Sequence, residues 1–387
     1  MSPAGNAGTA VAAEPALPSA AYVAALAGFR NMNVHRLAAL LRHHTPEEAW
    51  LVALGELPCS GLISRVLAHD DIRAMWRRCA LERPPAQVWQ RCADLGVQVL
   101  PYGHAGYPAG LLDDPLPPPV LFARGDLGLL SGRRVAIVGT RNATAAGREA
   151  ARAVGHGLAA AGVHVVSGLA RGIDGHAHRG AIGAEGRGRP IGIVASGLDV
   201  VYPREHADLW HAVGNCGLLL TEAPPGVPPE AHRFPLRNRI VAALSEVVVV
   251  VESRERGGSL ITAAQAIERD VQVMAVPGPV GKRASAGTNA LLCDGATPVT
   301  CADDVLTALS FQHSRSAVVA SDLRARPAGA DVAVYRVVHA DPRTIDGVSL
   351  ALGLSLVEAA MSLARLQSAG WVAQADGWFE CVGSPLR

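Results

Sequence analysis

The sequence predicts an α/β fold: a doubly wound, mainly parallel sheet, flanked by a small helical domain before it and a winged helix after it. Three observations support this. The chain has 387 residues, 49% hydrophobic and 18% charged, which suits two or three domains with buried cores. Between residues 134 and 309, short apolar runs alternate with helical patterns. Residues 331–381 have the pattern of a helix-turn-helix followed by a hairpin.

The overall composition limits the possible functions. The 35 basic and 34 acidic side chains give a net charge of +1, which by itself indicates no polyanionic partner. Lys282 is the single lysine, so any lysine chemistry has one candidate. The seven cysteines are scattered without a C-x-x-C pair, which argues against disulfides and zinc and favours a cytoplasmic location. The longest aliphatic run, residues 247–251, is too short to cross a bilayer, so we expect no membrane span.

The domain boundaries follow from changes in composition along the chain. Residues 1–20 are rich in Ala, Pro and Gly without the pattern of a signal peptide, and we expect a disordered tail. Residues 21–100 have helical spacing and a helix start at Thr45-Pro46, which predicts a small helical domain. The six prolines of residues 101–119 predict a stiff connector. The remaining expected parts are a sheet domain over residues 101–310, a linker over 311–330 and the winged helix over 331–387.

Six apolar runs predict the strands of the central sheet. They lack polar alternation, as is usual for strands covered on both faces, and this favours a parallel sheet with its ligand site at the carboxyl ends of the strands. The expected strands are residues 135–138, 164–166, 191–195, 218–221, 247–251 and 271–276.

The first expected strand is followed by Gly139-Thr140-Arg141 and then a helical pattern. A tight turn at a helix start offers free amides to an anion, and Arg141 can add a bidentate contact, so we predict a phosphate site. The alternative is that Gly139 only forms a turn, because the dinucleotide pattern G-x-G-x-x-G is absent.

A second loop of this kind follows the second strand. It contains Ser167, Gly168, Arg171, Gly172 and Asp174, again small and basic residues at a strand-to-helix junction. Because neighbouring strand ends share one edge of a parallel sheet, we expect both loops to face one groove. Asp174 alone favours a helix N-cap over a catalytic acid, since nothing nearby supplies a partner.

The richest segment opens the helix before the valine strand. Cations together with an aromatic residue are typical of single-strand binding, in which arginines contact phosphates and a ring stacks on a base. The alternative is that Arg237 or Arg239 pairs with an acid and that Phe234 belongs to the core. The candidates here, with the arginine after Tyr202-Pro203, are Arg204, Arg233, Phe234, Arg237, Asn238 and Arg239.

Small and hydroxyl residues also follow the last two strands, where backbone amides could approach phosphates. The patterns of a P-loop, a G-x-S-x-G elbow and an H-E-x-x-H site are all absent. We therefore predict no catalytic residue, no metal and no cofactor. The candidates are Gly258, Ser259, Thr262, Thr288 and Asn289.

In order, the motifs G-T-R, S-G-L-A-R-G-I-D, Y-P-R-E, F-P-L-R-N-R-I, G-G-S-L-I-T-A and G-T-N resemble the DNA-processing protein A family, DprA or Smf. The resemblance implies an extended Rossmann-like domain that binds single-stranded DNA, protects incoming strands during natural transformation, loads the recombinase RecA and acts as a homodimer without catalysis. It also implies that Arg141, the Ser167–Asp174 loop, Arg204 and the segment from Phe234 to Arg239 line a DNA groove, and that residues 21–100 form a SAM or helix-hairpin-helix-like domain. Gly28-Phe29-Arg30-Asn31 supplies only one of the expected helix-hairpin-helix glycines, which weakens the expectation of DNA contact there.

Two other functions stay open. The sheet also resembles nucleotide-hydrolysing enzymes of the lysine-decarboxylase-like group, but Ala263, Ala264 and Gln265 stand where a working glutamate is needed. Alternatively, the terminal domains make the protein an assembly scaffold.

Overall fold

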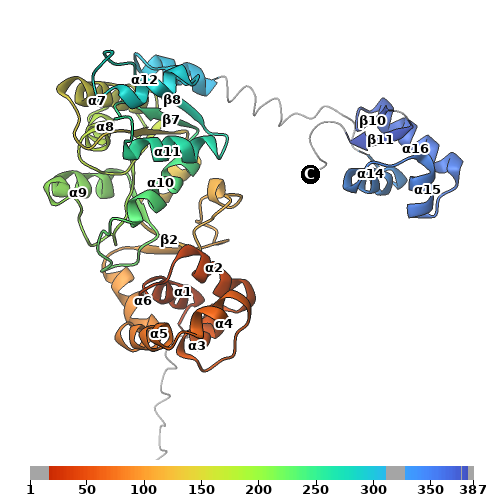
Figure 1. Ribbon diagram of the computed structural model, residues 1–387, viewed down its shortest axis with the longest axis horizontal. Coiled ribbons are helices and arrows are strands. Elements are labelled where there is room, and N and C mark those ends of the chain that lie inside the picture. The colour runs from red at the N-terminus through yellow and green to blue at the C-terminus, as the bar shows by residue number, and fades with distance from the viewer. Residues whose placement is uncertain (1–16, 311–326, 376, 382–387) are drawn as a thin grey trace, which may run out of the picture. The chain divides into compact units, whose positions relative to one another are not determined.

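The computed structural model describes residues 17–310, 327–375 and 377–381. The chain divides into two compact units, Met1–Leu309 and Ser310–Arg387. The first unit contains a helical module and a large sheet, and the second contains three helices and a hairpin (Figure 1). Most of the expected tail and linker falls outside the described residues, although the first helix already begins at Ser19.

The sheet of the first unit has nine strands in the order β1-β2-β6-β5-β4-β3-β7-β8-β9. The pairs β1–β2 and β2–β6 are antiparallel, and all the other neighbours are parallel, so the predicted mainly parallel sheet is confirmed. The strands are β1 (Gln98–Pro101), β2 (Val120–Gly125), β3 (Arg134–Val138), β4 (His164–Ser167), β5 (Pro190–Ile193), β6 (Leu218–Thr221), β7 (Val247–Val250), β8 (Gln272–Ala275) and β9 (Thr297–Pro298).

The six strands expected from the sequence are β3 to β8, and their ends agree within two residues. Sequence reasoning missed β1, β2 and β9. The proline segment expected to connect two domains instead joins β1 to β2 within this sheet. Because β1 ends at Pro101 and lies at the sheet edge, its short apolar stretch carried too weak a strand signal.

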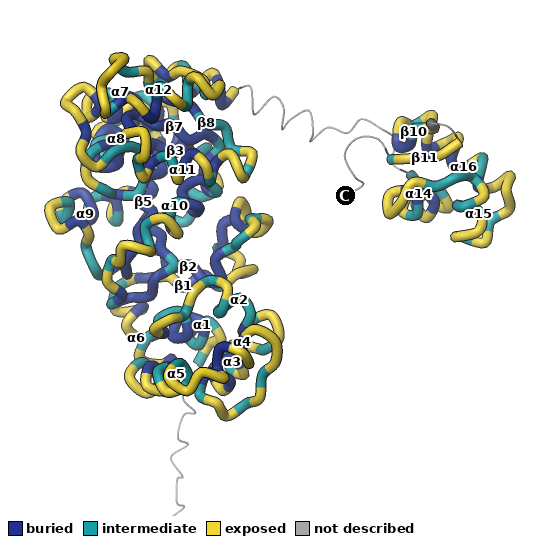
Figure 2. The backbone as a smooth tube through the Cα atoms, in the orientation of Figure 1, coloured by how far each residue is buried: buried dark blue, intermediate teal, exposed yellow. Residues whose placement is uncertain are grey.

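Helices cover both faces of the sheet, which is why its strands are apolar throughout. Val135 and Ile137 of β3 belong to one core cluster, with residues of α7 (Ala145–Ala160) and α8 (Ile173–Ile182). Ala136 and Val138 point the other way and belong to a second cluster, with α10 (Arg233–Ala243) and α11 (Gly258–Ile267). The buried strands form the dark centre of the unit in Figure 2. Two further helices are α9 (Ala207–Cys216) and α12 (Ala286–Cys293).

The helical module packs directly against the sheet. Its interior contains Phe29 in edge contacts with Trp50 and Trp76, at centroid distances of 5.5 and 6.2 Å. The same core cluster includes Phe122 of β2 and Trp210 of α9, so module and sheet share buried apolar surface. The predicted boundary near residue 100 stays a prediction. The module comprises α1 (Ser19–Ala27), α2 (Val34–His43), α3 (Pro46–Leu54), α4 (Gly61–Leu67), α5 (Asp70–Glu82) and α6 (Pro85–Asp94).

The second unit has its own core, built around Tyr335, Leu363 and Trp371. Its α15 and α16 begin at side-chain caps, and Ser355 with Glu358 forms a capping box at the start of α16. The order of three helices and an antiparallel hairpin agrees with the expected layout, and the winged-helix assignment stays a prediction. The elements are α14 (Ala330–Ala340), α15 (Ile345–Leu352), α16 (Leu356–Ser368), β10 (Val372–Ala375) and β11 (Trp378–Cys381).

Within the part of the chain that the structure describes, no single helix is long and apolar enough to cross a membrane. Only α15 and α16 taken together reach that length, across a bend of 114°.

Candidate nucleic-acid interface

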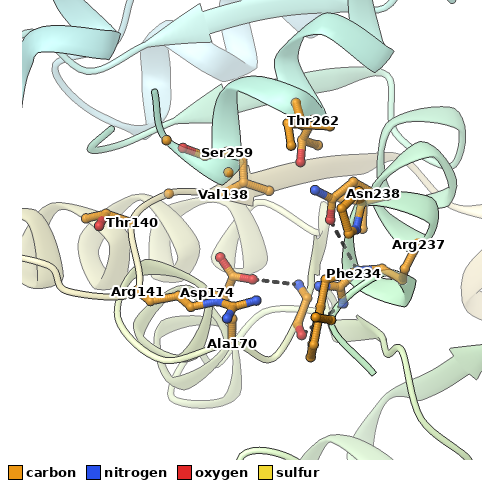
Figure 3. A pocket seen from close by; sticks show the side chains of 18 of the residues that line it. Val138, Thr140, Arg141, Ala170, Asp174, Phe234, Arg237, Asn238, Ser259 and Thr262 are labelled. Carbon is orange, nitrogen blue, oxygen red and sulfur yellow. Dashed lines mark hydrogen bonds between the residues drawn. The ribbon is translucent and has the colours of Figure 1, made fainter. Parts of the chain in front are cut away.

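The candidate site lies where the direction of winding of the sheet reverses. From β3 the chain winds outward through β4, β5 and β6, and then returns to place β7 on the other side of β3. The loops that follow β3 and β7 therefore lead away from each other. In open α/β sheets, the position between two such strands leaves a crevice in which ligands bind. A pocket of about 710 Å³ opens there, and we call it the switch-point pocket (Figure 3).

The structure brings most of the predicted site residues together around this pocket and leaves the rest outside its lining. The predicted residues that line it are Gly139, Thr140, Arg141, Gly168, Asp174, Phe234, Arg237, Asn238, Gly258, Ser259 and Thr262. Those outside the lining are Ser167, Arg171, Gly172, Arg204, Arg233, Arg239, Thr288 and Asn289.

Two glycines let the loops after β3 and β4 approach each other. A Cβ on Gly139 would lie 2.5 Å from a side-chain carbon of Ile173, and a Cβ on Gly172 would lie 2.3 Å from the carbonyl oxygen of Thr140. Gly172 also has a φ of +72°, a conformation that other residues rarely adopt. Gly172 therefore does not line the pocket itself, but it allows the two loops that line the pocket to come together.

Glu252, two residues after the end of β7, anchors the helix that follows the first loop. Its carboxylate accepts hydrogen bonds from the backbone N–H of Thr144, at 2.9 Å, and from the Thr144 hydroxyl. Thr144 in turn caps α7 by accepting the N–H of Gly147 at 3.0 Å. Sequence reasoning missed this role of Glu252. The sequence signal for this role was an acidic residue at the end of a buried strand, because a buried carboxylate needs hydrogen-bond donors or an opposite charge.

Asp174 and Arg237 form the buried floor of the pocket, with 6% and 7% of their surfaces exposed. Arg237 donates to the carbonyl oxygens of Gly168, at 2.9 Å, and Ile193, while Asp174 accepts the N–H of Gly168 at 3.1 Å. Burial raises the pKa of Asp174, and the charge of Arg237 and two backbone N–H groups oppose that shift. Burial lowers the pKa of Arg237 to about 10, so its guanidinium is still charged at neutral pH.

Asp174 is therefore neither the predicted N-cap nor an exposed acid. The helix α8 begins at Ile173 with Gly172 at its cap position, and the Asp174 carboxylate binds the preceding loop. Arg237 has the structural role that the sequence left as an alternative. Its side chain holds two backbone carbonyls and still borders the pocket (Figure 3).

Arg141, Phe234 and Tyr202 gather at the pocket mouth. The Cζ of Arg141 lies 4.7 Å from the centroid of the Phe234 ring, and the rings of Phe234 and Tyr202 are 5.5 Å apart. Arg141 is exposed, as is Arg254, a lining residue that sequence reasoning missed although it precedes the Gly257-Gly258 turn. The N-terminus of α11 begins at Gly258, also at the pocket. Cations, aromatic rings and free helix amides thus meet on one surface, the combination that binds phosphates and stacks bases.

Four predicted site residues instead have structural partners and are buried or half-buried. Arg239 is buried, pairs with Glu222 and donates to the carbonyl of Leu116 at 2.8 Å, which corrects its expected place in the groove. Ser167 donates to the carbonyl of Ile137 at 2.6 Å within the sheet. The remaining two, Thr288 and Asn289, belong to α12: Thr288 is buried, and Asn289 bonds both backbone groups of Gly278.

Three predicted arginines lie beyond the lining but stay accessible. Arg171 forms an ion pair with Glu205 at the surface. Arg204 is exposed two residues after the lining residue Tyr202. Arg233 donates to Glu230 at 3.0 Å and faces a different cavity. Among the described residues, no cluster of His, Cys, Asp or Glu could hold a metal ion.

Comparison with known proteins agrees with this architecture. The profile of the family described as DNA recombination-mediator protein A matches residues 98–310, which cover the whole sheet. The chain belongs to this family.

Other members of the DNA recombination-mediator protein A family match over much of the chain. The DNA processing protein DprA of Bacillus subtilis is 37% identical over 67% of this chain and 88% of its own length. A putative DprA of Mycobacterium tuberculosis is 39% identical over 80% of this chain and 79% of its own.

Two solved structures are also similar. The DprA of Streptococcus pneumoniae superposes with a TM-score of 0.60 at 30% identity, covering 74% of this chain and 95% of the other. The DNA processing protein A of Helicobacter pylori, which binds single-stranded DNA, gives a TM-score of 0.50 at 28% identity, covering 56% and 96%.

Proposed function

We propose that the switch-point pocket binds single-stranded DNA, with arginines and helix amides on the phosphates and aromatic rings on the bases. The observation that supports this most is the contact between Arg141 and Phe234 at the mouth, with Tyr202 beside it. A duplex stacks its bases internally, whereas a single strand offers free base faces to such rings. The single-strand binding of the similar Helicobacter protein supports the same assignment.

The direct test compares single- and double-stranded DNA of equal length over a salt series by fluorescence anisotropy. We expect preference for the single strand and affinity that falls steeply with salt. Arg141→Ala should weaken binding and make the salt dependence shallower. Arg187→Ala is the matched control. Arg187 is exposed just before β5, so it lies near the amino end of that strand, whereas the pocket lies at the carboxyl ends of the parallel strands. Equal affinity of Arg141→Ala and wild type for the single strand would show that DNA binds at another surface of the protein.

We also propose that the protein acts without catalysis, as a homodimer that protects incoming strands and loads the RecA recombinase during natural transformation. The family membership supports this role. Among the described residues that line the pocket, Asp174 is the one carboxylate, and its hydrogen bond to a backbone N–H suits scaffolding better than hydrolysis. In a recombinase assay, the protein should speed filament assembly on coated single strands. Release of free base from a nucleoside monophosphate would instead support the hydrolase alternative.

A further inference from the structure

A second and larger cavity, of about 1040 Å³, lies between the helical module and the segment that leads into α10. We call it the module pocket. One wall is the turn between α1 and α2 together with the end of α5, and the other wall is formed by residues 226–236. Both walls belong to the first compact unit.

The module pocket is basic. Arg30, Arg36, Arg83 and Arg233 line it, against the acids Glu82 and Glu230. Glu230 is already engaged by Arg233 at 3.0 Å. Within residues 17–310, neither Arg30 nor Arg83 forms an ion pair, so their charges are free to attract an anion. The net charge of +1 for the whole chain makes this local excess informative.

The turn that carries Arg30 is held rigidly by the core beneath it. Phe29 is buried between Trp50 and Trp76, and the indole N–H of Trp76 donates to the carbonyl of Arg30 at 3.1 Å. Asn31 adopts a φ of +60°, which directs the chain out of the turn. The backbone of Arg30 is therefore fixed while its side chain is exposed.

Arg83 lies between the two walls of the module pocket. A Cβ on Gly28 would be 3.4 Å from one guanidinium nitrogen, and a Cβ on Gly226 would be 2.8 Å from another. The guanidinium of Arg83 therefore lies close to the backbone of both the module and residues 226–236, most closely at Gly226. The cation is therefore placed at the junction before any ligand arrives.

The module pocket and the switch-point pocket share one segment of chain. Ala231, Phe234 and Pro235 line the switch-point pocket, whereas His232, Arg233 and Leu236 line the module pocket. Consecutive residues such as Arg233 and Phe234 have Cα atoms about 3.8 Å apart, so the two cavities flank a narrow ridge. A flexible polyanion held in the first cavity needs only to cross this ridge to reach the second.

We propose that the module pocket binds the continuation of the same single strand, with Arg30 and Arg83 on successive phosphates. This extension rests on the proposed function of the switch-point pocket. It gives the helical module a direct part in DNA binding, although its turn lacks the glycines of a helix-hairpin-helix. The strand would then contact two walls that face each other, which lengthens the binding site beyond the sheet.

The test uses the full-length protein and oligo-dT of two lengths, about 6 and about 20 nucleotides, chosen to fill one pocket or both. Arg30→Ala removes an exposed side chain, and Arg83→Gln removes the charge while keeping a polar side chain. On the longer strand, we expect each to lower affinity several-fold and to reduce the salt slope by about 0.7. On the shorter strand, binding should match wild type. Arg65→Ala is the control, because Arg65 is an exposed arginine on α4 that lines neither pocket.

The possible results distinguish the extension to the module pocket from the proposed function of the switch-point pocket. Wild-type affinity of both variants for the longer strand would overturn the extension and leave the proposed function intact. Equal losses on both lengths would also overturn it, since the module pocket would then not bind a separate stretch of DNA. Failure of the wild-type protein to bind either strand would instead refute the proposed function. Because Arg83 lies at the junction, Arg30→Glu provides a variant that leaves the junction unaltered, and it should lose more affinity than Arg30→Ala.

Discussion

The guanidinium of Arg141 lies over the ring of Phe234, with 4.7 Å between Cζ and the ring centroid. The two residues come from the loop after β3 and from the start of α10, about ninety positions apart in sequence. Their contact closes one side of the pocket mouth and presents a cation and a ring to the same ligand.

The Arg141–Phe234 pair predicts two distinguishable losses in single-strand binding. Arg141→Ala should reduce the salt slope by about 0.7, because one phosphate contact is removed. Phe234→Ala should cost about 1–3 kcal/mol of binding free energy with little change in that slope, because stacking carries no charge. Anisotropy titrations over a salt series measure both quantities. Phe234→Trp is the control that keeps a stacking surface. A wild-type salt slope for Arg141→Ala would contradict its phosphate contact, and wild-type affinity of Phe234→Ala would contradict stacking.

The buried floor predicts a stability effect at Asp174. Asp174→Ala leaves Arg237 buried without its neighbouring carboxylate and frees the N–H of Gly168, so the free energy of unfolding should fall by about 1–3 kcal/mol. Asp174→Asn should lose less, since its amide oxygen can still accept that N–H. Urea denaturation followed by circular dichroism measures the change. Asp208→Ala, which removes an exposed ion pair with Arg179, should have little effect.

Two glycine positions predict opposite outcomes for the same substitution. A Cβ on Gly168 would lie 2.4 Å from the guanidinium of Arg237, which its backbone hydrogen bonds hold in place. Gly168→Ala should therefore cost about 1–3 kcal/mol of stability through overpacking. A Cβ on Gly258 meets nothing within 4 Å and projects where the pocket opens. Gly258→Ala should leave stability equal or higher and weaken DNA binding, as thermal unfolding and anisotropy would show.

Asp199 predicts a pH dependence of the attachment between module and sheet. It accepts hydrogen bonds from Arg91 at 2.6 Å and from the N–H of Gly226 at 2.7 Å. Burial alone would raise the pKa of Asp199, but these hydrogen bonds hold it below its usual value. Its stabilising contribution is therefore complete above the unfolded pKa of about 3.9 and is lost as pH falls through the lower folded value.

Thermal unfolding of wild type and Asp199→Asn between about pH 6 and pH 3 measures this contribution. The variant should be less stable at pH 6, and the gap should close below about pH 4 as the wild-type carboxyl becomes protonated. Asp303→Asn, at an exposed position after β9, should show a small gap throughout. A constant gap for Asp199→Asn would contradict the lowered pKa.

The sequence predicted the central sheet well because buried parallel strands have continuous apolar runs. Strands β3 to β8 each stand out in this way, and a family motif follows each of them along the chain. The antiparallel strands β1 and β2 were missed because prolines surround them, and proline is the usual signal against a strand. Pro101 is tolerated in β1 because β1 is the edge strand of the sheet.

The site was harder to predict, because motif arginines look alike in sequence. Arg141, Arg237 and Arg239 all stand in family motifs, yet Arg141 is exposed while the other two are buried. Periodicity places Arg237 and Arg239 on one helix, but whether each meets a carbonyl, a carboxylate or solvent depends on strands distant in sequence. The Asn289 amide shows the same limit, since its partner Gly278 lies in a loop whose path the sequence did not show.

The sequence by itself determined the α/β architecture, the strands β3 to β8 and part of the set of residues at their carboxyl ends, because local apolar pattern and turn chemistry specify these. Only the tertiary structure decided which of the arginines face a ligand and which hold the fold. It also showed the basic cavity between the helical module and residues 226–236. The physical reason is that exposure and charge pairing are set by contacts between segments far apart in sequence, such as Arg83 with Gly226 and Arg239 with Glu222.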